Sequence, residues 1–123
     1  MTTVVVADDD QDIRSLISIA VGKAGLQLVA SVSDGALALK AILKHQPDLA
    51  ILDVSMPEMT GLEVCRAVRS DKSIGDLRIL LLTAAVDEAS QSIGLEAGAD
   101  YFLAKPFSPR ELASWLSVGK ESR

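Results

Sequence analysis

Short runs of apolar residues recur along the chain and alternate with segments whose apolar residues are spaced as on one face of a helix. Most runs are continuously apolar and rich in valine, isoleucine and leucine, which is typical of strands that are covered on both faces in a parallel sheet. The five expected strands are Thr3–Ala7, Leu26–Ser31, Leu49–Leu52, Leu77–Leu82 and Tyr101–Ala104.

Helical spacing of apolar residues fills the intervals between these runs. The first interval repeats apolar residues at i, i+3, i+4 and i+7, between the N-cap candidate Asp10 and Gly25, which is expected to end the helix. A second helix is expected from near Asp34 to before Pro47, because proline disfavours helical backbone in the preceding residue. The remaining clear helices are marked by Leu62, Cys65 and Val68, and by Leu112, Trp115 and Leu116 after Ser108-Pro109.

The segment Asp87–Ala97 is a weaker helix candidate. Ser90, Gln91, Ser92 and Gly94 are poor or middling helix formers, and a glycine alone costs about 1 kcal/mol relative to alanine. We therefore expect a helix of marginal intrinsic stability here.

The alternation of strands and helices predicts the fold class. Five strand–helix units indicate an α/β, doubly wound, five-stranded parallel sheet with five helices on both faces, joined by right-handed crossovers. No linker or composition change separates a second unit, so residues 1–123 are expected to form one domain, with no output domain.

Composition and charge argue against several classes of function for this chain. The chain has 123 residues, of which 49% are hydrophobic and 24% charged, as in an ordinary soluble domain. Seventeen acidic and 12 basic residues give a net charge of −5, which disfavours direct nucleic-acid binding. A single cysteine and the lack of zinc-ligand spacing argue against a disulfide or a zinc site. Without a signal sequence or an apolar run of membrane-spanning length, a cytoplasmic location is expected, with no membrane partner.

Polar residues follow four of the expected strands. Asp8 and Asp9 follow the first, Asp53 the third, Thr83 the fourth and Lys105 the fifth. Open α/β sheets bind ligands outside these carboxyl ends, where the strand order reverses. In the order 2-1-3-4-5 the first and third strands are neighbours, so the three aspartates are expected to converge.

Three carboxylates in one crevice repel one another and need positive charge nearby. Lys105 supplies one cation, and Mg²⁺ suits a site with carboxylates, waters and a substrate phosphate. An aspartate beside a metal, a lysine and a hydroxyl is suited to form an aspartyl phosphate, because positioning and charge neutralisation account for most of phosphoryl-transfer catalysis.

Four sequence segments resemble the receiver domain of two-component response regulators. They lie in the order and at the spacing of that family, on the expected strand ends, and the resemblance runs from Val4 to about Leu116. The segments are VVVADDDQDIR (4–14), ILDVSMPEMTG (51–61), LLLTAA (80–85) and AGADYFLAKPF (97–107).

The resemblance implies a role for each residue of the site. Asp53 would be the phosphoacceptor, Asp9 a direct Mg²⁺ ligand and Asp8 a ligand through a metal-bound water. Lys105 would bridge Asp53 and later a phosphoryl oxygen, and Thr83 would bind the phosphoryl group and carry the switch. The other implied residues are Arg14 as a register marker, the Ser55 backbone carbonyl as a metal ligand, Phe102 as the switch aromatic residue, Pro106 behind a cis peptide bond, and Pro57 and Gly61 in the loop.

The resemblance also implies a phosphorylation-dependent signalling switch rather than an enzyme acting on other substrates. A sensor histidine kinase or a histidine phosphotransfer protein would phosphorylate the chain. The face formed by 87–97, the last strand and the last helix would change and bind a downstream protein target, or act on an output domain missing from this sequence. The chain would then be either a free-standing regulator or a piece of a longer one.

Three alternatives remain open from the residues. A haloacid-dehalogenase-type phosphatase also uses a carboxylate and Mg²⁺, but Asp12 stands where threonine or valine is expected, and a late carboxylate cluster is missing. A flavodoxin-like cofactor module would need a Gly/Thr/Ser-rich loop where acidic residues follow the first strand. A degenerate receiver that no longer accepts phosphate is disfavoured by the complete set of acidic residues, threonine and lysine.

Overall fold

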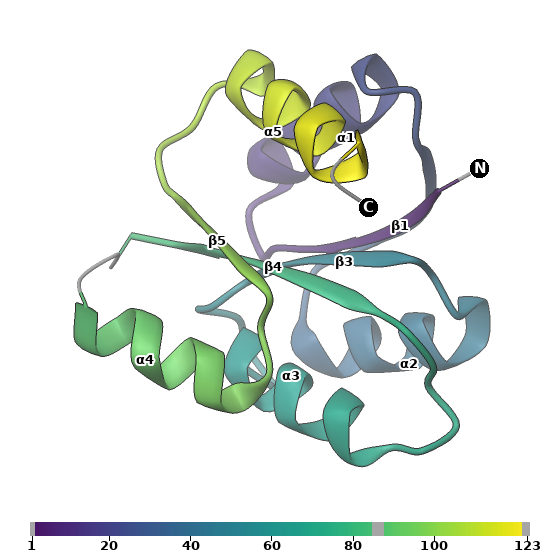
Figure 1. Cartoon of the computed structure of the whole chain (residues 1–123), viewed down its shortest axis with the longest axis vertical. Helices are drawn as coiled ribbons and strands as arrows, with labels where there is room; N and C mark the ends of the chain where they lie inside the picture. Colours follow the sequence, from purple (N-terminus) through teal and green to yellow (C-terminus); the bar gives the residue numbers. More distant parts are fainter. Residues whose placement is uncertain (1, 85–87, 122–123) are drawn as a thin grey trace.

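Strands and helices alternate along the whole chain (Figure 1). The structure, a computed structural model, describes residues 2–84 and 88–121, without the side chains of 118–121. The strands are β1 (Thr3–Ala7), β2 (Gln27–Val32), β3 (Leu49–Asp53), β4 (Arg78–Thr83) and β5 (Tyr101–Ala104). The helices are α1 (Gln11–Lys23), α2 (Gly35–His45), α3 (Gly61–Ser70), α4 (Glu88–Ala97) and α5 (Pro109–Glu121).

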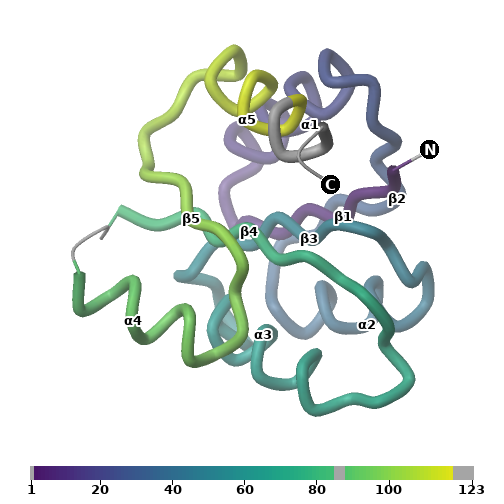
Figure 2. The backbone as a smooth tube through the Cα atoms, viewed as in Figure 1, coloured from purple at the N-terminus to yellow at the C-terminus, as the bar shows by residue number. Residues whose placement is uncertain are grey.

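The five strands form one parallel sheet in the order β2-β1-β3-β4-β5, which Figure 2 shows from one edge to the other. β1 lies between β2 and β3, so that Val6 pairs with both Ser31 and Ile51. The sheet confirms the expected doubly wound fold and the expected strand order. It also makes β1 and β3 neighbours, as the convergence of the aspartates requires.

The helices cover both faces of the sheet. Helices α1 and α5 lie on one face, and α2, α3 and α4 lie on the other (Figure 1). Successive strand residues point to opposite faces, so Val4 and Val6 enter the core under α1 and α5, while Val5 enters the core under α2 and α3. Both faces of the inner strands are therefore buried, which explains their continuously apolar sequences.

Capping residues fix the helix starts that position the site. The Asp10 side chain accepts hydrogen bonds from the backbone N–H groups of Asp12 (2.9 Å) and Ile13 (3.4 Å), which confirms it as the N-cap of α1. Helix α3 begins with a capping box in which Thr60 and Glu63 bond each other's backbone N–H groups, a feature that the sequence reading did not identify.

Several element boundaries differ from those expected. β2 begins and ends one residue later than expected, and Asp53 and Thr83 are the last residues of their strands rather than the first residues beyond them. They remain in the sheet because Asp53 pairs with Leu82, and Thr83 with Ala104. The expected helix start at Asp87 and the motif residue Ala85 lie outside the described residues.

Candidate functional site

The carboxyl edge of the sheet gathers polar residues from four strands. Asp8 follows β1, Asp53 ends β3, Thr83 ends β4 and Lys105 follows β5. Because the strands are parallel and in register, their carboxyl ends open onto the same crevice. The structure thus brings together the residues that the sequence placed at strand ends.

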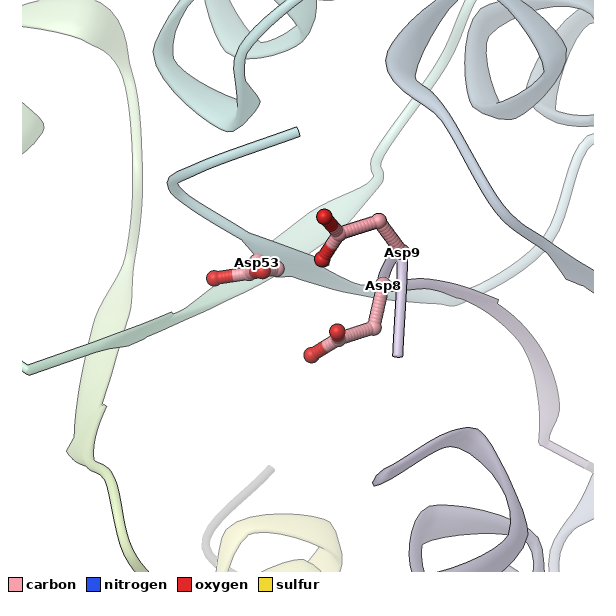
Figure 3. A group of neighbouring side chains, drawn as sticks. All are labelled: Asp8, Asp9 and Asp53. Atoms are coloured by element: carbon pink, nitrogen blue, oxygen red, sulfur yellow. The ribbon is translucent and has the colours of Figure 1, made fainter. Parts of the chain in front are cut away.

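Three carboxylates converge between β1 and β3. One oxygen from each of Asp8, Asp9 and Asp53 lies within 4.8 Å of the others. Figure 3 shows Asp8 and Asp9 projecting from adjacent positions after β1 toward the space beside Asp53. Asp8 is completely buried and Asp53 is 5% exposed, whereas Asp9 faces solvent. The cluster is therefore anchored inside the protein and open on one side.

Lys105 joins the two buried carboxylates. Its ammonium nitrogen Nζ lies 2.9 Å from Asp8 Oδ2 and 3.3 Å from Asp53 Oδ1. The lysine side chain is only 23% exposed, so the interaction is partly shielded from water. One lysine thus faces at least two negative charges, and among the described residues the crevice keeps an excess of negative charge.

Backbone contacts hold Asp8 in place. Arg14 Nη1 donates a 2.7 Å hydrogen bond to the Asp8 carbonyl, and the Asp10 backbone N–H donates to Asp8 Oδ1 at 2.9 Å. Asp8 Oδ2 accepts no hydrogen bond of good geometry despite its closeness to Lys105. Burying a carboxylate oxygen that accepts no hydrogen bond lowers the stability of the fold unless a further cation or donor faces it.

The electrostatics of the crevice shift two pKa values. Burial, reinforced by the charge of Asp8, raises the pKa of Asp53 above its usual value, against the opposing effect of Lys105. Burial alone would lower the pKa of Lys105, but its close contact with Asp8 and the negative charges of Asp53 and Asp8 raise it. The lysine therefore stays charged, and negative charge on Asp53 is less favourable here than in water.

The donor set suits a hard divalent cation. Carboxylate oxygens are the ligands that Mg²⁺ prefers, and an exposed Asp9 beside buried Asp53 leaves room for the several waters that Mg²⁺ retains. The Ser55 backbone N–H donates to Asp53 Oδ1 at 3.3 Å, which keeps this residue beside the cluster. The Ser55 carbonyl as a metal ligand remains a prediction.

The loop after β3 is shaped by close backbone packing. The Gly61 N–H donates to the Val54 carbonyl at 3.0 Å, and a Cβ at Gly61 would collide with the Asp53 carbonyl. The Pro57 carbonyl accepts from the backbone N–H of Met59 at 2.8 Å and of Gly35 at 3.4 Å. Gly61 and Pro57 thus support the backbone that presents Asp53.

Thr83 and Phe102 border the same cavity from the neighbouring strands β4 and β5. Thr83 is 9% exposed, and Phe102 pairs with Leu81 in the neighbouring strand. Both residues border a mostly apolar cavity of about 120 Å³. The peptide bond between Lys105 and Pro106 is cis, as the resemblance implied.

The amino edge of the sheet contains an ion pair that the sequence reading missed. Arg69 donates to Asp100 Oδ2 at 2.8 Å and also to the carbonyls of Leu77 and Gly98. No local motif marks Arg69 and Asp100, which are 31 residues apart. Nearby Cys65 is buried, and burial raises the pKa of its thiol to about 12, so it is not a reactive nucleophile.

Comparisons with known proteins agree with this geometry. The family model described as response regulator receiver domain matches residues 4–117. The transcriptional regulatory protein GltR of Pseudomonas aeruginosa is 47% identical over 116 residues, which cover 94% of this chain and 48% of GltR. The regulatory protein PhoP of Bacillus subtilis, named for alkaline phosphatase synthesis, is 40% identical over 109 residues, covering 89% of this chain and 44% of PhoP. The chain spans about half the length of these curated relatives.

A solved structure shows the same architecture. The chemotaxis response regulator CheY4 of Vibrio cholerae superposes with a TM-score of 0.88 at 35% identity, covering 96% of this chain and 98% of CheY4. The family match disfavours the phosphatase and flavodoxin-like alternatives. In the part of the chain that the structure describes, no helix is long and apolar enough to cross a membrane.

Proposed function

Because this chain belongs to the response regulator receiver domain family of two-component signalling, we propose that it is a phosphorylation-dependent switch whose phosphoacceptor is Asp53. The observation that carries the proposal is the arrangement of Lys105, which lies 2.9 Å from Asp8 and 3.3 Å from Asp53 beside the solvent-facing Asp9. In a degenerate receiver that no longer accepts phosphate, these buried charges would lower the stability of the fold without serving a reaction.

The phosphoryl donor is the phosphohistidine of a sensor histidine kinase or of a histidine phosphotransfer protein. Asp53 Oδ1 lies near Lys105 and the Ser55 N–H, so Oδ2 is the oxygen that attacks phosphorus. The phosphorus–oxygen bond forms as the phosphorus–nitrogen bond breaks, and the electron pair stays on the imidazole nitrogen. Hydrolysis later transfers the phosphoryl group to water and restores the carboxylate. The domain thus catalyses only its own phosphorylation and dephosphorylation.

The side chains around Asp53 position the transferred group. Lys105 exchanges its contact with Asp53 for one with a phosphoryl oxygen, and the Thr83 hydroxyl donates to another oxygen. Asp9 would hold Mg²⁺ directly and Asp8 would hold it through a water, while Asp53 and the Ser55 carbonyl would complete the protein ligands. When bound, Mg²⁺ neutralises the negative charge that gathers on the phosphoryl oxygens.

Phosphorylation then changes the surface on which α4 lies. The phosphoryl group adds a charge of about −1.5 to −2, which draws Thr83 toward it. Movement of Thr83 frees space for the ring of Phe102 beside the 120 Å³ cavity. Helix α4 follows, so the face of α4, β5 and α5 acquires a different shape for a downstream protein or an output domain. Binding of that partner and phosphorylation then favour each other.

The direct test is phosphoryl incorporation from a small phosphodonor in the presence of Mg²⁺. We expect Asp53→Asn to abolish the acid-stable, hydroxylamine-labile label that the unmodified chain acquires. Asp76→Asn is the matched control, because Asp76 is an exposed aspartate just before β4, at the opposite edge of the sheet. Undiminished labelling of Asp53→Asn would refute the assignment, as would equal loss in both variants.

A further inference from the structure

The ring of Phe102 packs directly against the backbone of α4 at Gly94. Gly94 is buried in the interior of the helix. A Cβ built at Gly94 would lie 2.5 Å from Phe102 Cζ and 3.4 Å from Leu81 Cδ1, whereas real Cβ atoms do not approach ring carbons so closely. The ring therefore occupies space that is open only because residue 94 has no side chain.

An empty apolar space lies next to the same ring. The cavity of about 120 Å³ is bordered by Phe102, Gly94 and Thr83. The other lining residues are Val54, Leu62, Leu81, Ser90 and Ile93. An apolar cavity only slightly larger, about 150 Å³, accepts a benzene ring. The ring thus has a second place available, in the cavity that Thr83 also borders.

We propose that Gly94 is a positioning residue of the switch, whose missing side chain lets Phe102 rest against α4 and keeps the cavity beside Thr83 open. This inference rests on the proposed function, because it assigns to Gly94 the control of a movement that phosphorylation drives. A methyl group at position 94 displaces the ring. The displaced ring then moves into the cavity, because an aromatic ring is more stable among apolar groups than in water.

The proposed role of Gly94 explains why a residue of low helix propensity stands inside α4. Alanine would strengthen the helix, yet at position 94 it would also remove the resting place of the ring. Gly94 therefore lowers the stability of the helix, but it preserves the position that the Phe102 ring has without phosphorylation.

The test compares two glycine-to-alanine substitutions within helices. Gly94→Ala introduces the collision with Phe102, while Gly22→Ala in α1 is the matched control, since nothing lies within 4 Å of a Cβ there. Both substitutions replace a helical glycine by alanine, so a movement of the Phe102 ring that only Gly94→Ala produces reports the contact with the ring.

The position of the ring is read by fluorine NMR of protein labelled with 4-fluorophenylalanine. The chain has two phenylalanines, and Phe107 serves as an internal reference because it lies in the other core, under α1 and α5. We expect Gly94→Ala to move the Phe102 resonance, without phosphorylation, to the position reached by the unsubstituted protein with beryllofluoride and Mg²⁺. Beryllofluoride in the presence of Mg²⁺ should bind Gly94→Ala about fivefold more tightly than the unsubstituted protein, because the substitution already favours the arrangement that this ligand selects.

The proposal is overturned if the Phe102 resonance of Gly94→Ala stays in place, moves to a solvent-exposed position, or moves equally in Gly22→Ala. If Gly94→Ala fails to fold, Phe102→Leu is added to remove the colliding ring atoms. Recovery of the fold supports the contact, and continued unfolding overturns it. Failure of the proposed function is distinguishable, because the unsubstituted protein would then take up neither beryllofluoride nor phosphoryl label, whatever the ring does in Gly94→Ala.

Discussion

The two edges of the sheet both hold a cation beside an aspartate, but they satisfy these charges differently. At the amino edge Arg69 donates to Asp100 and to the carbonyls of Leu77 and Gly98. Asp100 Oδ2 also accepts from the Ile79 backbone N–H at 2.9 Å. One arginine meets one carboxylate, and the pair connects α3 to the segments that lead into β4 and β5.

At the carboxyl edge the charges do not balance. Lys105 alone faces the buried Asp8 and Asp53, with Asp9 close by, and Asp8 Oδ2 accepts no good hydrogen bond. The pKa of Asp53 is raised by burial and by Asp8 because the folded chain resists a second negative charge there. Further positive charge at this edge would reduce the repulsion among the three carboxylates.

The difference separates a pair that stabilises the fold from a cluster to which we assign the chemistry of phosphoryl transfer. Balanced, hydrogen-bonded charges hold elements together, whereas buried like charges lower stability and persist where a reaction needs them. Substitutions at the two edges are therefore expected to change stability in opposite directions, and cation binding should respond at only one of them.

The largest expected effect is stabilisation by Mg²⁺. At about 100 times its dissociation constant, Mg²⁺ should raise the free energy of unfolding by about 2.7 kcal/mol, because it binds only the folded cluster. Asp9→Asn, which removes a proposed direct ligand, should abolish most of this gain, while Asp76→Asn should retain it. Urea denaturation with and without Mg²⁺ measures both, and equal stabilisation of the two variants would contradict the assigned site.

A smaller effect is expected at the amino edge. Arg69→Met should lower the free energy of unfolding by about 1–2 kcal/mol, because two carbonyls and the partly exposed Asp100 each lose one hydrogen-bond donor. Labelling of Asp53 should be unchanged. A loss of labelling in a folded Arg69→Met protein would show that the two edges are not independent.

The smallest effect is a gain of stability at the phosphoacceptor. Without metal, Asp53→Asn should raise the free energy of unfolding by about 0.5–1 kcal/mol at neutral pH, because it removes a buried charge next to Asp8. Since the pKa of Asp53 is higher in the folded chain than in the unfolded chain, this gain should vanish in acid and grow as the pH rises. Denaturation of both proteins at acidic and neutral pH tests the trend, and a constant or reversed difference would contradict it.

The fold was predictable because its signals are local and repeated. The continuously apolar strands, the Asp10 and Asp34 caps and the glycine after α1 each act over a few residues, and their order alone specifies a doubly wound sheet. The strand ends were less predictable, since Asp53 and Thr83 stay in the sheet through pairing with neighbouring strands.

The site was only partly predictable. The strand-end aspartates and Lys105 could be located because parallel strands bring their carboxyl ends together. The Arg69–Asp100 pair and the packing of Phe102 on Gly94 depend on contacts between distant segments, for which the sequence carries no local signal. Gly94 was interpreted only as a weak point of its helix, although the ring that it accommodates lies on another element.

The most direct test of the central claim is to locate the phosphoryl group. After treatment with a small phosphodonor and Mg²⁺, borohydride reduction converts an aspartyl phosphate into homoserine, which mass spectrometry places in the sequence. The account predicts homoserine at position 53 alone. Homoserine at position 8, 9 or elsewhere, or its absence from a protein that binds Mg²⁺, would contradict the account.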